Sequence, residues 1–210
     1  MRILPERTVD AWAAWYLLLR FPTANLWAPS QNDDFRWDFG FESLPGKGFV
    51  LENKGVLDRP RSVRLSLRQL AWYVQEVALR LCTAVYYVLP TLPQTYSRSG
   101  SSSSGVVPAI AAARLRMPFE KTTFVVDLED LIPYVASRSP RHHARQLASA
   151  LRRNDWRIVS PHFLYTMSQS EIGRVPSATT LERFADALTE CDPLVGFHYF
   201  ARGPDRPIPR

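Results

Sequence analysis

The chain has 210 residues, and its 26 Lys+Arg against 20 Asp+Glu give a formal net charge of +6. Hydrophobic residues make up 46% and charged residues 22%, a globular balance that excludes a wholly disordered chain. The length supports one α/β domain, with or without a small appendage. The nearest candidate for a membrane span, residues 11–19, is shorter than the roughly 20 apolar residues that cross a bilayer. We therefore expect no membrane partner, and the basic balance favours an anionic one.

Two cysteines bear on the compartment. Cys82 and Cys191 show no metal-type spacing, and each lies in an apolar, helix-like segment. Such cysteines are typical of buried thiols in a reducing environment. The sequence therefore predicts a cytoplasmic protein.

The first 90 residues predict a helix, three strands, a helix and a strand. Helical spacing of apolar residues predicts the helix over residues 7–20. Strict alternation over residues 35–42 predicts a half-buried strand, and turn residues at 44–48 connect it to a second strand over residues 49–54. The next three elements are a short strand, an amphipathic helix and an apolar strand, over residues 63–65, 66–82 and 83–89.

The rest of the chain begins with a loop rich in Pro and Ser over residues 90–108. After it we predict two strands and three helices, namely strands 122–126 and 195–200 and helices 128–136, 141–153 and 178–191. The predicted organisation is a core over residues 1–90, a loop over 91–108 and a C-terminal α/β extension over 109–210. The extension completes or flanks the same domain.

The predicted hairpin brings carboxylates together. Glu42 and Glu52 flank nine residues centred near Lys47, so alternation places Glu42, Glu52 and Lys54 on one face. Directly opposed residues have Cβ atoms about 5 Å apart, which suits two carboxylates that share Mg²⁺ or Mn²⁺. Asp38 has the parity of Glu42 but lies about 13 Å further along the strand. A bulge or a register shift would make Asp38 the ligand instead.

The strand that carries Glu52 is predicted to be central and buried, because apolar residues flank Glu52 on both sides. Buried charges are costly unless they are paired or bound to a metal, so Glu52 and Lys54 need a reason to be there. Gln69 and Tyr73 are four residues apart and share one face of the next helix. We expect Gln69 to point towards Glu52 and Lys54.

The order of these motifs resembles that of the PD-(D/E)xK nuclease superfamily. An acidic residue comes first, the Glu52-Asn53-Lys54 triplet second, and the helix motif Gln69-Leu-Ala-Trp-Tyr73 last. The likeness is to the branch with RecB-type and phage-type exonucleases, whose helical motif is Gln-hydrophobic-x-x-Tyr. It covers roughly residues 7–90. It implies a restriction-endonuclease-like core, a mixed sheet flanked by helices.

The resemblance also implies roles for these residues. Glu52, with either Glu42 or Asp38, would hold Mg²⁺ or Mn²⁺, and Lys54 would orient or activate the attacking water.

By the same likeness, Gln69 and Tyr73 would position the site or a substrate phosphate. The implied activity is a metal-dependent nuclease, with DNA expected over RNA.

The chain departs from the family pattern at the first acid, which is Glu42 rather than Asp and has no Pro before it. This departure leaves two other hypotheses open. One is a catalytically inactive, nuclease-like module that binds nucleic acid or a protein. The other is a structural protein in which Glu52 and Lys54 form a buried ion pair.

Basic residues predict where nucleic acid would be held, because phosphates need clustered cations. One group lies between the hairpin and the next helix, and a second lies on the predicted helix 141–153. The residues expected to contact phosphates are Arg59, Arg61, Arg64, Arg68, Arg141 and Arg145.

Overall fold

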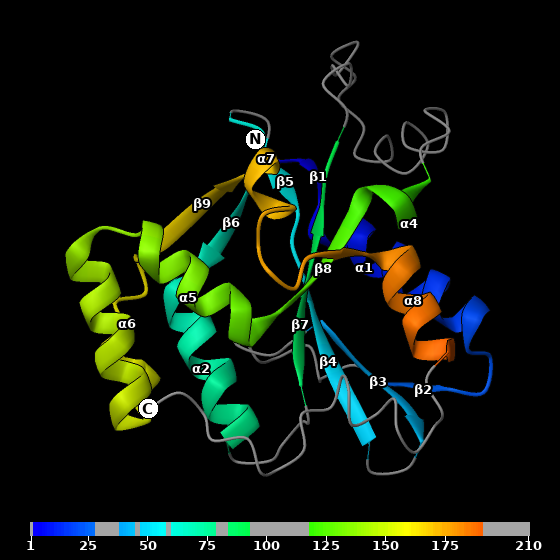
Figure 1. Cartoon of the computed structure of the whole chain (residues 1–210), viewed down its shortest axis with the longest axis horizontal. Coiled ribbons are helices and arrows are strands. Elements are labelled where there is room, and N and C mark those ends of the chain that lie inside the picture. Colours follow the sequence, from blue (N-terminus) through cyan, green and yellow to red (C-terminus); the bar gives the residue numbers. More distant parts are fainter. Residues whose placement is uncertain are drawn as a thin grey trace.

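Two β-sheets and the helices around them make up the described part of the chain (Figure 1). The computed structural model describes residues 2–27, 38–44, 47–57, 60–78, 84–92 and 118–190. The strands are β1 (Arg2–Leu4), β2 (Asn25–Trp27), β3 (Phe39–Leu44), β4 (Lys47–Asn53), β5 (Val56–Leu57), β6 (Ser62–Ser66), β7 (Val85–Pro90), β8 (Thr123–Asp127), β9 (Leu164–Ser168) and β10 (Thr179–Thr180). The helices are α1 (Glu6–Arg20), α2 (Leu67–Ala78), α4 (Phe119–Thr122), α5 (Leu128–Arg138), α6 (Arg141–Arg153), α7 (Gln169–Ile172), α8 (Leu181–Glu190) and the 3₁₀ helix η1 (Trp156–Ile158).

The larger sheet has six strands in the order β10-β8-β7-β4-β3-β2. β4 is parallel to β7, whereas the other neighbouring pairs are antiparallel, so the sheet is mixed. Buried residues of α1 and α8 pack on one face, and buried residues of α2 and α5 pack on the other (Figure 1). The predicted α/β class with a mixed sheet between helices is confirmed.

Side chains of β4 alternate between the two faces of this sheet. Phe49 and Leu51 belong to the core beneath α1 and α8, and Val50 belongs to the core beneath α2 and α5. Glu52 is two residues after Val50 and therefore points towards α2. A charged side chain thus takes the place of a core residue on a central strand.

The smaller sheet has the order β1-β5-β6-β9. The predicted strand 63–65 is confirmed as β6, but it pairs with β5 and β9 rather than with the hairpin. Val63 and Leu65 are buried, whereas Arg64 is exposed. Because β6 runs directly into α2, this sheet sets where α2 begins.

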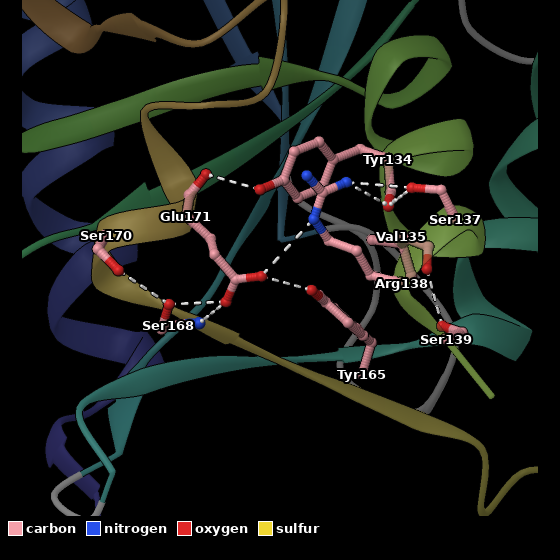
Figure 2. Close-up of polar contacts among 9 residues, drawn as sticks. All are labelled: Tyr134, Val135, Ser137, Arg138, Ser139, Tyr165, Ser168, Ser170 and Glu171. Carbon is pink, nitrogen blue, oxygen red and sulfur yellow. Dashed lines mark hydrogen bonds and ion pairs between the residues drawn. The ribbon is translucent and has the colours of Figure 1, made fainter.

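A polar cluster connects β9 to α5 and α7 (Figure 2). The Glu171 carboxylate accepts hydrogen bonds from the Ser168 backbone N–H at 2.8 Å, from Ser168 Oγ at 2.6 Å and from the Tyr165 hydroxyl at 2.7 Å. Arg138 Nε lies 3.9 Å from the same carboxylate, and the Arg138 guanidinium stacks over the Tyr134 ring at 3.7 Å. The contacts of Ser168 form a capping box that begins α7, so the cluster holds the end of β9 in place.

The predicted helices and strands agree best with the structure where the periodic pattern in the sequence is long. The predicted helix 141–153 has the same bounds as α6, and α1 begins one residue before the prediction. α5 begins at the predicted residue, Leu128, and ends two residues later than predicted, at Arg138. α8 begins at Leu181 rather than 178, because residues 179–180 pair with β8 as β10.

Some predictions concern residues outside the described ranges. These are the Ser-rich part of the loop, the last strand over 195–200, Cys82, Cys191 and Arg59. Beyond the loop, β8 pairs with β7, so the C-terminal half adds strands to the sheet that contains β4. None of the helices in the described ranges has the length and apolar character needed to cross a membrane.

Candidate active site

Three of the predicted residues donate to the carboxylate of Glu52, which is 3% exposed. Lys54 Nζ donates to Oε1 and forms an ion pair with it. Gln69 Nε2 donates to the same oxygen at 2.9 Å, and the Tyr73 hydroxyl donates to Oε2. The expectation that Gln69 points towards Glu52 is confirmed, and Tyr73 comes to the same carboxylate.

The sequence around α2 explains how these donors reach β4. α2 begins at Leu67, directly after β6, and the backbone N–H of Gln69 donates to Ser66 Oγ at 3.3 Å in its first turn. Leu67, Leu70 and Tyr73 are buried on the side of the helix that packs against the sheet. Gln69 and Tyr73 are one helical turn apart, so both side chains reach the same point on β4.

The register of the hairpin decides which second acid lies near Glu52. Glu42 pairs with Gly48, and Phe39 pairs with Leu51, so Asp38, directly before β3, lies near the end of β4 that carries Glu52. The expectation that Glu42 opposes Glu52 is therefore wrong. Leu44 pairs with Lys47, so the hairpin pairing is centred about two residues before Lys47, and Glu42 lies about four strand positions, or about 13 Å, from the level of Glu52.

Asp38 is held against the end of β4 by backbone contacts. Its N–H donates to the Leu51 carbonyl at 3.1 Å, and its Oδ2 accepts from the backbone N–H of Asn53. Burial, together with the charges of Glu52 and Asp10, raises the pKa of Asp38 to about 8. The alternative first acid is therefore the one that the fold brings to Glu52.

Asp10 on α1 is a third carboxylate in this region, and no pattern in the sequence predicted its place there. Asn53 Nδ2 donates to Asp10 Oδ1 at 2.8 Å. Burial raises the pKa of Asp10 to about 6, with smaller contributions from Glu6 and Glu52. One feature of the sequence could have indicated this place. Asp10 directly follows Val9, the first of the buried residues Val9, Ala13 and Leu17 of α1.

Tyr87 on β7 is a second residue that was not foreseen. It pairs with Glu52 across the parallel strands and is fully buried, and its ring lies 5.8 Å from Lys54 Nζ. Burial, reinforced by the charge of Glu52, raises the pKa of both Tyr73 and Tyr87. Both phenols therefore remain protonated near neutral pH, and Tyr73 acts as a donor.

Lys54 is 7% exposed and remains charged. Burial by itself would lower the pKa of Lys54, but the adjacent Glu52 carboxylate outweighs burial and raises it. A cation is thus held next to a carboxylate pair in a site that is largely shielded from water. In such surroundings electrostatic interactions are stronger than in bulk water.

The donor chemistry of the site suits a hard divalent cation. In the part of the chain that the structure describes, no three His, Cys, Asp or Glu side chains form a group that could hold a metal ion by themselves. Mg²⁺ is, however, commonly held by one or two carboxylates, with waters and substrate phosphates as its other ligands. Asp38 and Glu52 make such a pair, and their mutual repulsion is the kind that a cation relieves.

The arginines predicted to contact phosphates occupy different places. Arg64 is exposed on β6, and the guanidinium of Arg68 packs over the Trp156 ring at 4.6 Å. Arg141 and Arg145 are exposed on α6, which packs against α2 and η1 (Figure 1). In that view α2 lies between α6 and the six-stranded sheet, so α6 is separated from the strand of Glu52 by α2.

The chain was compared with protein-family models, with curated proteins and with solved structures, and none of the three comparisons found a match. A function must therefore be inferred from the chemistry around Glu52.

Proposed function

We propose that the chain is a metal-dependent nuclease that hydrolyses phosphodiester bonds, with DNA expected over RNA and with Mg²⁺ or Mn²⁺ as its cofactor. The observation that supports this most is the buried Glu52, which has a cation and two neutral donors around it and Asp38 beside it. Burying such charges is costly, and a stable fold does not require them. The free-energy cost of burying these charges is explained if the site binds a metal ion and catalyses a reaction.

Each residue has a role in this proposal. Asp38 and Glu52 would hold the cation, which when bound supplies Lewis acidity and a more acidic water at the phosphate. Lys54 offers an ammonium group to the charge that develops on the phosphate oxygens. Gln69 and Tyr73 fix the two oxygens of Glu52, so the carboxylate keeps one orientation.

The arrangement of the sheet is consistent with a restriction-endonuclease-like core, which we also propose. The strand with Glu52 and Lys54 pairs antiparallel with the strand that follows Asp38, and it runs parallel to β7 after the crossover through α2. The pairing places the acid, the Glu-x-Lys triplet and the helix motif at one end of β4.

One observation favours a second candidate, a nuclease-like module that binds nucleic acid without cutting it. Both oxygens of Glu52 already accept hydrogen bonds from Lys54, Gln69 and Tyr73. A buried carboxylate that is satisfied in this way is stable without a metal ion.

The test compares Asp38→Asn with Glu42→Gln, because both replace an acid by its amide and only Asp38 lies near Glu52. Mn²⁺ binding is measured by calorimetry, and cleavage is followed on labelled DNA and RNA. We expect wild-type cleavage only with Mg²⁺ or Mn²⁺. Asp38→Asn should reduce cleavage by about a hundredfold or more and weaken Mn²⁺ binding, whereas Glu42→Gln should change neither.

Two results would contradict the nuclease proposal. One is cleavage by Asp38→Asn at the wild-type rate. The other is binding of nucleic acid by the wild type without cleavage in Mn²⁺, which would favour the binding module.

A further inference from the structure

A pocket of about 200 Å³ opens beside the candidate active site. Lys54 and Gln69, which both contact Glu52, form part of its wall. The wall continues to Leu57, Arg64 and Leu164, which lie on three strands of the smaller sheet. The pocket is thus the space where the two sheets and α2 meet.

The backbone fixes the shape of this pocket. A Cβ atom on Gly55, another lining residue, would lie 2.6 Å from the Leu4 carbonyl oxygen and 3.0 Å from the Glu6 amide nitrogen, so only glycine allows β1 and α1 to approach here. On the other side, Arg64 pairs with Thr166 and Ser66 with Leu164. These positions share one face of the smaller sheet, opposite the buried Val63 and Leu65.

The pocket combines a cation with apolar walls. Arg64 is exposed, and among the described residues no acidic side chain forms an ion pair with it. Leu164 is 42% exposed, and Leu164 and Leu57 both contribute apolar surface to the pocket wall. Glu6 is an acidic lining residue on the side of α1, next to Lys54.

This chemistry matches one unit of a polyanionic strand. Arg recognises phosphate through paired N–H donors, and leucine side chains contact the apolar faces of sugars and bases. Pockets that enclose a whole small ligand have about 300–1,000 Å³. A space of about 200 Å³ that is continuous with the active site suits one part of a longer ligand.

We propose that this pocket holds the nucleotide next to the scissile phosphodiester, with Arg64 bound to its phosphate and Leu57 and Leu164 against its sugar or base. The proposal rests on the nuclease function proposed above and adds a subsite to it. Arg64 is then a substrate-binding residue at a defined position, unlike the arginines of α6.

The test uses a set of oligonucleotides that each carry one uncharged methylphosphonate, placed in turn on either side of the cleaved bond. With the wild type, we expect kcat/KM to fall about tenfold when the phosphate that Arg64 contacts is neutralised. Arg64→Ala should lose about tenfold on the unmodified strand, with no further loss from the modification at that position. Arg64→Lys keeps the charge, so its kcat/KM on the unmodified strand should lie between those of the wild type and Arg64→Ala.

Arg183→Ala is the matched control. Arg183 is exposed on α8, which packs on the opposite face of the six-stranded sheet, and the substitution changes the net charge equally. We expect it to behave as the wild type on every oligonucleotide. Mn²⁺ binding and the melting temperature of Arg64→Ala should match the wild type, since Arg64 is a surface residue.

Two results would overturn the subsite. In one, Arg64→Ala is as sensitive as the wild type to the modification at every position; in the other, it is indistinguishable from Arg183→Ala. In both, the wild type still cleaves, so the nuclease function survives. If the wild type cleaves no nucleic acid with Mg²⁺ or Mn²⁺, the proposed function fails and the subsite fails with it.

Discussion

Glu52 is the residue that the other residues of the candidate site contact or approach. Lys54, directly after β4, and two donors on α2 reach its two oxygens, and Asp38 lies near it. Removing one partner from a buried ion pair costs about 3–5 kcal/mol, because the other charge is left uncompensated. Substitutions at Glu52 or Lys54 therefore change both the stability of the fold and the activity. Substitution of a neutral partner such as Tyr73 separates the two effects better.

Tyr73→Phe removes only the hydroxyl that donates to Glu52 Oε2. We expect the free energy of unfolding to fall by about 1–3 kcal/mol, because a buried carboxylate oxygen loses its donor. Urea unfolding measures this loss, and cleavage should fall because Glu52 is held less firmly. Tyr16→Phe on α1 is the control, since Tyr16 lies only partly buried on another helix. Equal unfolding curves for the two variants would contradict the contact.

The raised pKa of Asp38 predicts a pH-dependent stability. The pKa is about 8 in the folded chain against an ordinary value of 3.8, so the folded state binds this proton more tightly than the unfolded state. The contribution is fully present below about pH 4 and is lost as the pH rises towards 8. In the presence of a chelator, the free energy of unfolding of the wild type should therefore fall over this pH range. The free energy of unfolding of Asp38→Asn should fall less.

Melting temperatures measured from pH 5 to pH 8 provide the check. Asp10 contributes a similar loss of stability in both proteins, but only up to about pH 6, because its pKa is about 6. Mn²⁺ should restore the wild type at pH 8 and leave Asp38→Asn unchanged, because a bound cation offsets the repulsion between the carboxylates. Parallel pH curves for the two proteins would count against a raised pKa at Asp38.

At the scale of elements, β9 matters because it pairs with β6 and brings Leu164 to the pocket. Its end is held by the cluster around Glu171 (Figure 2). Burial would raise the pKa of Glu171, but the hydrogen bonds from Ser168 and Tyr165 outweigh burial and lower it. The ionised carboxylate therefore stabilises the fold above its ordinary pKa of 4.5, and this contribution is lost as the pH falls through the lowered value.

Glu171→Gln should destabilise the fold at pH 7 by about 1 kcal/mol, since the capping carboxylate loses its charge. For a chain of this size that corresponds to a melting temperature about 2–4 °C lower. Glu182→Gln is the control, because its carboxylate lies 3.6 Å from a largely exposed Lys121 and such surface pairs contribute little. A melting temperature equal to that of the control would contradict the role of the cluster.

At the scale of the whole molecule, the net charge of +6 and the exposed arginines of α6 predict a salt-dependent affinity for nucleic acid. α6 packs on α2, away from Glu52, so its contacts would position the substrate rather than act on the cleaved bond. Loss of such a contact should weaken binding without slowing cleavage at saturating substrate.

Replacing either Arg141 or Arg145 by Ala should reduce the slope of log affinity against log salt by roughly one unit, because one phosphate contact is lost. Mobility shifts at several salt concentrations measure the slope, and Arg183→Ala controls for net charge. A wild type without salt-dependent affinity for DNA or RNA would count against both the nuclease and the binding module. The buried ion pair would then be only structural.

The sequence by itself determined those features that depend on short, regular repeats. Helical periodicity predicted α1 and α6, and the spacing of Gln69 and Tyr73 predicted that Gln69 points to Glu52. Apolar neighbours on both sides of Glu52 predicted a buried, central strand. These predictions hold because side-chain direction in a helix or strand is set by local geometry.

The tertiary structure decided which residues from distant segments meet. The register of the hairpin pairs Glu42 with Gly48 and leaves Asp38 near Glu52, and α1 brings Asp10 to Asn53. β9 and β10 are strands because they pair with segments about 50 to 100 residues away in the sequence. Register and pairing depend on packing between segments, which no local pattern encodes. For the same reason, only the fold placed Arg64 in a pocket beside Lys54.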